Sequence, residues 1–390
     1  MAVATPYSEK TDEQRAITEM VRQFVDEQVI PIAEEHDHED KFPDAVVEQM
    51  KELGLFGVTI PEEYGGMGLD LTTYAMIVEE LSRGWISVSG IVNTHFIGSY
   101  LLMKFGTDEQ KEKYLPKMAT GEIRAAFSLS EPGLGSDVAA ISTRAKQDGD
   151  HWVINGTKLW ASNGNRADVL SVFAATDRSL GARGGISAFI VEKAFGGVTV
   201  ARLEEKMGLH GSDTALLIFE DCRVPQENVI GPVGAGFLTA MKTLDSGRLT
   251  LGAAALGGAQ AALEEMTRWA QAAVEDGRPI AQRQAIQWLI ADTAMEISAL
   301  RHMVYSAAWL YDQGKRITRE SAMIKAYATE IGARVVDRAV QVHGTAGLRL
   351  GAPVERAFRD ERIARIFEGT NEIQRMIIAQ ETFRQMGYRA

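Results

Sequence analysis

Cysteine is almost absent from this chain: Cys222 is the single one among 390 residues. One cysteine excludes an internal disulfide framework and is typical of a reducing compartment, so we expect a cytoplasmic protein. Acidic residues stand beside Cys222, and no histidine lies near it in sequence. This setting favours a small residue at a strand end over a catalytic nucleophile.

Basic residues are also scarce. Lysine and arginine number 41 against 53 aspartates and glutamates, which gives a net charge of −12. Nucleic-acid binding needs clustered positive charge, so no nucleic-acid partner is expected. No run of 18 uninterrupted apolar residues exists, and we expect no membrane span. The acidic start, Met1 to Glu13, resembles neither a secretory signal nor an arginine-rich transit peptide.

Several common ligand-binding signatures are missing. No Walker sequence occurs, and the glycine-rich run 231–236 lacks the strand and helix context of a dinucleotide fold. The run 36–40, His-Asp-His-Glu-Asp, has metal-binding side chains. Its dense charge on an expected loop is more typical of solvated surface, so we predict no metal site.

The apolar content of 45% and charged content of 24% are ordinary for a soluble globular protein. At this length, two or three packed units are expected. Residues 11 to about 122 show helical spacing of apolar residues. The first helix is predicted to end before Pro31, and Pro43 and Gly54 are predicted to bracket the next one.

The pattern changes near Arg124. Short apolar runs, typical of strands, follow up to about residue 232, and Asn155-Gly156 and Gly184-Gly185 are predicted turns between them. Beyond Pro232 the chain is rich in Ala and Leu at helical spacing. We therefore predict an α+β protein with an all-α domain at 1–122, a barrel-like or sandwich-like β domain at 123–232 and a helical bundle at 233–390.

Two motifs carry the functional information. The first runs from Phe127 to Asp137, FSLSEPGLGSD, and the second from Ile366 to Arg375, IFEGTNEIQR. From the residues alone, the first reads as a Pro-Gly turn and the second as a helix capped by Thr370 or Asn371. Glu368 would then be an acid that complements the dipole of that helix.

Together, these motifs resemble the acyl-CoA dehydrogenase family of FAD enzymes. The resemblance covers nearly the whole chain and implies the same three-domain plan, with a C-terminal four-helix bundle. It also implies that Glu368 removes the α-proton of a fatty-acyl thioester while a hydride leaves the β-carbon for the flavin, giving a trans-2-enoyl-CoA. Electrons would then pass to an electron-transferring flavoprotein.

The resemblance also assigns site residues. For FAD these are Phe127, Leu129, Ser130, Ser136, Trp160, Ser162, Gln341, Gly344, Thr370 and Glu372. For the acyl-CoA they are Ser136, Asp245 and Arg248. Without the resemblance, Trp160 reads equally well as a core residue, and Asp245 with Arg248 as an ordinary salt bridge at i,i+3.

The chain departs from the family where the distal half of FAD would cross a subunit interface. Ala273 and Asp276 stand where the family has Arg and Phe. Thr345 and Leu348 replace a Gly and an aromatic residue. Either a nearby arginine, Arg278 or Arg283, substitutes, or a different partner chain completes the site.

The resemblance implies a homodimer or homotetramer, and a heteromer stays open. An oxygen-using flavin oxidase and a flavin-poor subunit of a heteromeric dehydrogenase are the alternative functions. The sequence does not fix the acyl chain. Trp85 stands where the family often has small residues, so it is a candidate for narrowing the acyl pocket.

Overall fold

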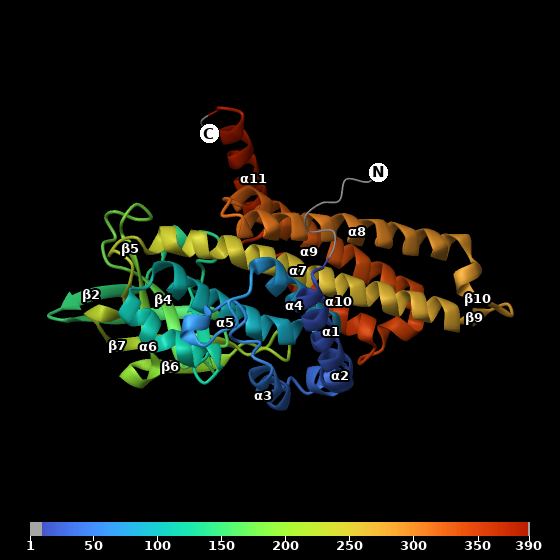
Figure 1. Ribbon diagram of the computed structural model, residues 1–390, viewed down its shortest axis with the longest axis horizontal. Helices are drawn as coiled ribbons and strands as arrows, with labels where there is room; N and C mark the ends of the chain where they lie inside the picture. The colour runs from blue at the N-terminus through green and yellow to red at the C-terminus, as the bar shows by residue number, and fades with distance from the viewer. Residues whose placement is uncertain (1–9, 389–390) are drawn as a thin grey trace.

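The structure is a computed structural model that describes residues 10–388. Helices come first, a β-sheet follows, and long helices close the chain (Figure 1). This order confirms the predicted α+β class. The first part comprises α1 (Asp12–Phe24), a π-helical segment η1 (Val25–Val29), α2 (Ile30–His38), α3 (Asp44–Glu52), α4 (Leu71–Gly84), α5 (Ile86–Phe105) and α6 (Asp108–Ala119).

The middle part is one mixed sheet of eight strands. Strand order is β6-β7-β3-β2-β4-β5-β8, and β1 pairs in parallel with β4. Buried strand residues contact α5 and α6 on one side of the sheet. The strands are β1 (Ala125–Ser128), β2 (Arg144–Asp148), β3 (His151–Ser162), β4 (Val169–Ala175), β5 (Ile186–Glu192), β6 (Val198–Leu203), β7 (Thr214–Pro225) and β8 (Val229–Ile230).

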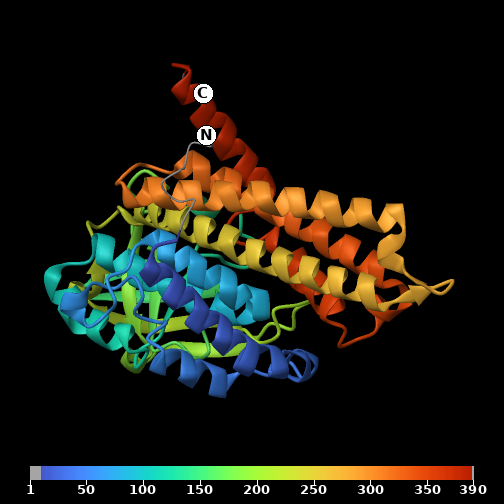
Figure 2. The same ribbon diagram turned by 45° about the vertical axis from the view of Figure 1, so that its right-hand side comes forward.

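Three long helices dominate the last part and lie side by side in both views (Figures 1 and 2). A short hairpin joins the first two, and α11 projects from the body. The elements are α7 (Gly236–Ala272), β9 (Val274–Glu275), β10 (Arg278–Pro279), α8 (Gln284–Asp312), α9 (Thr318–His343), α10 (Pro353–Ala364) and α11 (Asn371–Gln385).

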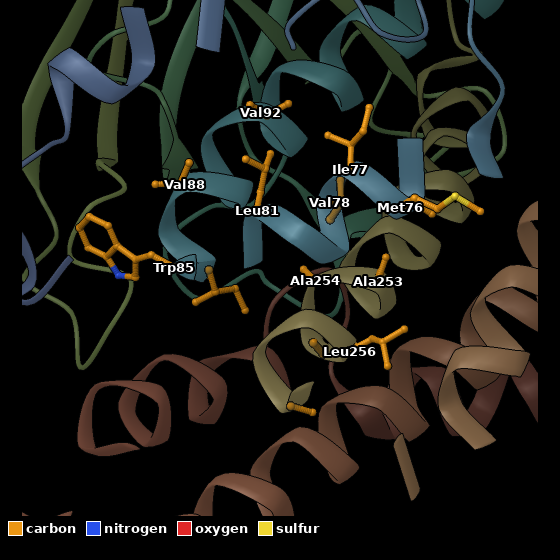
Figure 3. Packing of buried hydrophobic residues seen from close by; sticks show 14 of the residues in the cluster. Met76, Ile77, Val78, Leu81, Trp85, Val88, Val92, Ala253, Ala254 and Leu256 are labelled. Atoms are coloured by element: carbon orange, nitrogen blue, oxygen red, sulfur yellow. The ribbon is translucent and has the colours of Figure 1, made fainter. Parts of the chain in front are cut away.

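Helix α4 packs directly on α7, which joins the first part to the last. Figure 3 shows α4 beside α7, with Val78 of α4 on the side of Ala253 and Ala254 and Ile77 pointing away from them. The small residues of α7 allow this approach. At Gly257, an added Cβ would lie 2.1 Å from the carbonyl oxygen of Glu79, so only glycine fits at this contact.

Helix α5 is the one described helix that is long and apolar enough to cross a membrane, but 83% of its most apolar window is buried inside the protein. Trp85, at its start, is buried against Gly211, where an added Cβ would lie 2.3 Å from the indole. Figure 3 shows this indole pointing away from the α4–α7 contact. Trp85 therefore fills the space beside the loop that contains Gly211.

The predicted helix end before Pro31 is wrong, because the chain stays helical to His38. Proline has no backbone N–H, so it interrupts a regular helix. Here the π-helical turn Val25–Val29 precedes α2, and Pro31 occupies one of the first two positions of α2. At those positions the missing N–H has no intrahelical partner to lose.

The predicted hairpin at Asn155-Gly156 is also wrong, since both residues lie inside β3. The pairing of β3 with β7 shifts register there, which marks a β-bulge. An added Cβ at Gly156 would lie 2.5 Å from Thr143 Oγ1. The glycine serves a close approach of neighbouring backbones, and the turn between β2 and β3 lies at Gly149 instead.

The acidic run 36–40 is exposed at residues 38–40, as expected, but Asp37 departs from the expected solvated loop. Residues 36–38 form the last turn of α2, and Asp37 is buried. Its carboxylate pairs with Arg359 of α10 at 2.5 Å and lies 3.5 Å from His210. Charge density in the sequence suggested exposure, but pairing with distant cations allowed burial. Cys222 is buried in β7, and burial raises the pKa of its thiol to about 11, as expected for an unreactive residue.

Candidate active site

Glu368 lies in the turn between α10 and α11 with a positive φ of 55°, which is uncommon for a residue other than glycine. Thr370 caps α11 by accepting a hydrogen bond from the Ile373 backbone at 3.4 Å. The Gln374 side chain reaches back and donates to the carbonyl oxygens of Glu368 and Gly369, at 3.2 and 3.0 Å. The first turn of α11 therefore holds the Glu368 backbone in place.

Helix α7 contacts the same turn from the other side. Arg248 Nε donates to the Glu368 carbonyl oxygen at 3.3 Å, and Arg248 Nη1 pairs with Asp245 Oδ1 at 3.2 Å. Asp245 in turn accepts a hydrogen bond from the Thr318 hydroxyl at 2.5 Å. Arg248 is almost fully buried, so this pair differs from an ordinary surface salt bridge.

The carboxylate of Glu368 has an apolar setting. Its Oε2 atom is buried and accepts no hydrogen bond from residues 10–388. An added Cβ at Gly247 would lie 3.0 Å from both Oε2 and Ile97 Cδ1, so the missing side chain leaves room for the carboxylate. Burial raises the pKa of Glu368 to about 7, while Arg248 and then Lys325 oppose the rise. A carboxylate tuned in this way suits general-base chemistry near neutral pH.

An aromatic pair, of which Tyr74 lies near this carboxylate, was not foreseen from the sequence. Tyr74 of α4 is 1% exposed, and its hydroxyl has no hydrogen-bond partner within the described chain. Burial, and then the charge of Glu368, raises the pKa of Tyr74. Its ring stacks on Phe96 of α5 at 4.5 Å. Both residues follow ordinary helical core spacing, so nothing in the sequence separates them from other core residues.

The motif Phe127–Asp137 begins in β1 and continues beside β3. Leu159 of β3 donates its backbone N–H to the Ser130 carbonyl at 2.9 Å, which brings Ser130, at the end of the Phe127–Ser130 segment, next to Trp160. Trp160 has a φ of 62° inside a second bulge of β3 and is 55% exposed. The core interpretation of Trp160 is therefore wrong. Strained backbone that presents a large aromatic side chain is typical of ligand sites.

A buried ion pair lies beneath this surface, and no local pattern in the sequence indicates it. Lys158 Nζ pairs with Glu131 at 2.8 Å and also donates to the Leu129 carbonyl at 3.0 Å. Glu131 also accepts hydrogen bonds from the backbones of Ser142 and Thr143. Although burial opposes it, these partners lower the pKa of Glu131 to about 2. The pair fixes the 129–143 segment to β3.

The remaining predicted residues fall into two groups. Thr370 and Glu372 begin α11 beside Glu368, Ser162 ends β3 near Trp160, and Ser136 is exposed in the turn after Glu131. Gln341 and Gly344 are exposed at the far end of α9. There the ring of His343 stacks on the ring of Trp269 of α7, with centroids 4.8 Å apart. Along α7, Trp269 and Arg248 are separated by roughly 30 Å at the standard helical rise. One chain therefore does not bring Gln341 and Gly344 to Glu368.

The altered positions lie at that same far end. Asp276 has a φ of 50° at the tip of the β9–β10 hairpin, followed by Gly277. Arg283 Nη2 bridges Asp276 at 2.9 Å and Glu275 at 3.0 Å. Arg283 is thus already engaged by two carboxylates, whereas Arg278 forms no ion pair within the described residues. Thr345 and Leu348 are exposed nearby, after α9.

Comparison with known proteins decides the family. Three family models match: the acyl-CoA dehydrogenase N-terminal domain at residues 11–122, the middle domain at 126–222 and the C-terminal domain at 234–383. The chain belongs to the acyl-CoA dehydrogenase family. The predicted family and enzyme class, an oxidoreductase, are therefore confirmed.

Individual relatives in this family are similar over most of their length. An acryloyl-CoA reductase (NADH) of Anaerotignum propionicum is 42% identical, covering 96% of this chain and 95% of the relative. The mitochondrial short-chain specific acyl-CoA dehydrogenase of Rattus norvegicus is 43% identical, covering 93% and 88%. A chain solved in work on the electron transferring flavoprotein of Acidaminococcus fermentans and flavin-based electron bifurcation has a TM-score of 0.95 at 40% identity, covering 96% and 99%.

Proposed function

We propose that this chain catalyses the FAD-dependent α,β-dehydrogenation of a short-chain acyl-CoA to a trans-2-enoyl-CoA. The observation that carries the proposal is the Glu368 Oε2 atom, which is buried and has no hydrogen-bond partner in the described chain. Its turn is held from α7 by Arg248 and from α11 by Gln374. Such a group has no evident structural task, but it suits the removal of a weakly acidic proton.

Each nearby residue then has a role. Glu368 Oε2 accepts the α-proton, and Arg248 keeps the Glu368 backbone fixed with the support of Asp245. The backbone N–H of Glu368 would polarise the thioester carbonyl, which is an oxyanion-hole role. Tyr74 and Phe96 exclude water from the carboxylate. FAD, when bound, supplies the acceptor for the hydride that leaves the β-carbon.

The surface around Trp160 fits a flat aromatic cofactor. Its exposed indole stands beside the Phe127–Ser130 segment, and the buried Lys158–Glu131 pair makes this surface rigid. We assign Phe127, Leu129, Ser130, Trp160 and Ser162 to the flavin ring, with Thr370 and Glu372 at its edge. Ser136 is assigned to both flavin and thioester. Gln341 and Gly344 are assigned to the FAD of a neighbouring subunit, because they lie far from Glu368 in their own chain.

The short acyl chain is inferred from the residues around Glu368. Tyr74 stacks on Phe96, and Phe96 lies 5.7 Å from the ring of Tyr100, so three aromatic rings occupy the space between α4 and α5. Ile97 closes the space beside Gly247. The names of two relatives, a short-chain specific dehydrogenase and an acryloyl-CoA reductase, support a small acyl group.

The redox partner, the oligomeric state, the cellular location and the domain boundaries stay predictions. We propose an electron-transferring flavoprotein as the redox partner, in keeping with the similar chain from work on such a flavoprotein. A homodimer or homotetramer, a cytoplasmic location and domain boundaries near residues 122 and 232 also remain predictions. A heteromer stays open because of the altered positions around Asp276.

Anaerobic flavin bleaching tests the function. The purified, FAD-loaded chain is mixed with acyl-CoAs of four, eight and twelve carbons, and the loss of flavin absorbance is followed. We expect fast bleaching by the four-carbon substrate and slow or no bleaching by the twelve-carbon one. Failure of every acyl-CoA to bleach a fully loaded flavin would refute the function, and a preference for twelve carbons would refute the short chain.

The similarity to an acryloyl-CoA reductase favours a second candidate, reduction of a 2-enoyl-CoA at the same site. The two directions are separated by supplying a short enoyl-CoA to the chemically reduced enzyme and comparing that rate with the forward rate. Peroxide formed in air would instead support the oxidase alternative.

A further inference from the structure

Lys325 of α9 is buried without a paired acid. Its side chain is 0% exposed, yet it forms no ion pair with any carboxylate of the described chain. Its ammonium donates one hydrogen bond, to Asn371 Oδ1 at 2.9 Å. A buried cation costs several kcal/mol unless interactions offset it, and an apolar residue would fill this space at lower cost. The retention of a lysine therefore needs an explanation.

The hydrogen-bond partner of Lys325 lies at the start of the helix that follows Glu368. Asn371 is the first residue of α11, and its backbone N–H donates to the Arg365 carbonyl at 3.1 Å. Its side-chain Nδ2 donates to Thr329 Oγ1 and Glu330 Oε1, both at 3.0 Å. Three residues of α9 thus hold the Asn371 amide. The bonds to the Lys325 ammonium and to the Glu330 carboxylate are charge-assisted, which is the stronger kind of hydrogen bond.

Lys325 also adds charge to the surroundings of Glu368. Arg248 approaches from α7 and Lys325 from α9, while Tyr74 of α4 contributes a neutral phenol. Burial lowers the pKa of Lys325 to about 8, with Glu368 the first group that opposes the drop, and Glu372 and Glu330 also opposing it. At neutral pH Lys325 therefore remains a cation.

We propose that Lys325 is a positioning residue for the base, which clamps the start of α11 through Asn371 and keeps the buried Glu368 carboxylate ionised by its fixed positive charge. The clamping of α11 by Lys325 is independent of the proposed function. The effect of Lys325 on Glu368 as a base rests on that proposed function. Arg248 and Lys325 both act on the charge of the Glu368 carboxylate. Arg248 also bonds the Glu368 backbone, whereas Lys325 also holds the start of the next helix.

Two substitutions separate charge from clamping. Lys325→Met removes both, whereas Thr329→Val is nearly isosteric and keeps the Lys325 charge. Thr329→Val removes the hydrogen bonds of the Thr329 hydroxyl to the Asn371 side chain and to the backbone carbonyls of Lys325 and Ala326. The protonation of Glu368 is followed by the infrared band of its neutral carboxyl, identified as the band that Glu368→Gln abolishes. We expect Lys325→Met to raise the Glu368 midpoint by about one unit, as the loss of a nearby opposite charge predicts. Thr329→Val should leave the midpoint unchanged.

The acidic limb of flavin reduction by a short acyl-CoA should move in parallel. A higher midpoint leaves less ionised Glu368 at pH 6.5, so the Lys325→Met rate there should fall severalfold more than at pH 9. Lys325→Arg should restore the wild-type midpoint. Because Lys325→Met can lose stability, Lys325→Gln, which keeps a hydrogen-bond donor without the charge, serves as the second neutral variant.

An unshifted infrared midpoint in folded Lys325→Met or Lys325→Gln would overturn the proposal and leave Lys325 a purely structural residue. The proposal also fails if Thr329→Val shifts the midpoint as much as Lys325→Met does. The infrared titration needs no turnover. If Glu368→Gln keeps full activity, the proposed base falls while the titration still reports on Lys325.

Discussion

The two ends of helix α7 differ in how far this chain completes them. Around Asp245 and Arg248, charges are buried, a glycine makes room for the Glu368 carboxylate, and α5, α9 and α11 contribute contacts. Around Ala273 and Asp276, a two-strand hairpin extends beyond the body (Figure 1), and the Asp276 side chain is 86% exposed. One end is defined by its own chain. The end at Ala273 and Asp276 needs a second chain to complete a binding site.

A buried and an exposed ion pair differ in the same way in their contribution to stability. Lys158 and Glu131 approach to 2.8 Å in the interior, and Arg283 and Asp276 approach to 2.9 Å at the surface. The distances are nearly equal, but their contributions are not. Removing one partner of a buried pair leaves an uncompensated charge, whereas water already solvates both partners of the exposed pair. A short distance alone therefore says little about what a salt bridge does.

The largest effect should come from the reaction centre. Glu368→Gln keeps the size of the side chain but removes the base, so flavin reduction should slow by about a hundredfold to ten-thousandfold, the usual contribution of general-base catalysis. Bound flavin should stay constant. Stopped-flow reduction by a short acyl-CoA measures the rate, and a loss of less than tenfold would show that Glu368 is not the base.

Next comes the support of the flavin surface. Lys158→Met leaves the Glu131 carboxylate buried without its cation and should destabilise the fold by about 3–5 kcal/mol. Urea unfolding measures this change. The control is Lys146→Met on β2, an exposed lysine of the same sheet. A loss below about 1 kcal/mol for Lys158→Met, or an equal loss in both variants, would contradict the rigid-support role.

The sequence predicted the fold class and the Glu368 turn because both depend on local signals. Helical spacing, strand runs and the Thr370 cap each operate within a few residues of the chain. The failures have the opposite character. Pro31 and Asn155-Gly156 carry strong local signals, but a π-helical turn and a β-bulge, both stabilised by tertiary packing, overrode them.

The residues that pair around the site could not be predicted from the sequence, because their contacts depend on tertiary packing. Lys325 and Asn371, or Lys158 and Glu131, come together only through packing between elements distant in the chain. A buried lysine looks like any other lysine in a sequence. Trp160 shows the converse case, because its residue type alone also allowed a core position, while a bulge in β3 exposes it.

A moderate effect is expected at the flavin surface itself. Trp160→Ala removes the exposed indole, and a lost aromatic stacking contact should weaken FAD binding by roughly tenfold or more. Reoxidation of reduced flavin by oxygen should also become faster. Leu180→Ala, an exposed apolar residue in the loop after β4, is the control. Unchanged FAD affinity in Trp160→Ala would place the flavin elsewhere.

The smallest effect concerns the far end of α7 and tests whether another chain completes it. Asp276 and Glu275 pair with Arg283 at the surface, so these two carboxylates compete for its guanidinium with the pyrophosphate of a neighbouring subunit's FAD. Asp276→Asn should release Arg283 in part and remove a repelling charge, and FAD retention after dialysis should rise by a few-fold. Asp148→Asn, an exposed acid on β2 paired with Arg223, is the control.

The wild-type chain provides the reference for that last comparison, through its flavin content per protomer and its mass in solution. Loose or substoichiometric FAD in the wild type, improved by Asp276→Asn, would mean that the altered hairpin limits binding and that a homologous partner is the natural remedy. One tightly held FAD per protomer in a homodimer or homotetramer, unaffected by Asp276→Asn, would contradict the heteromer. Arg278, which has no acidic partner in the described chain, would then be the residue to replace next, because it is the remaining cation on the hairpin.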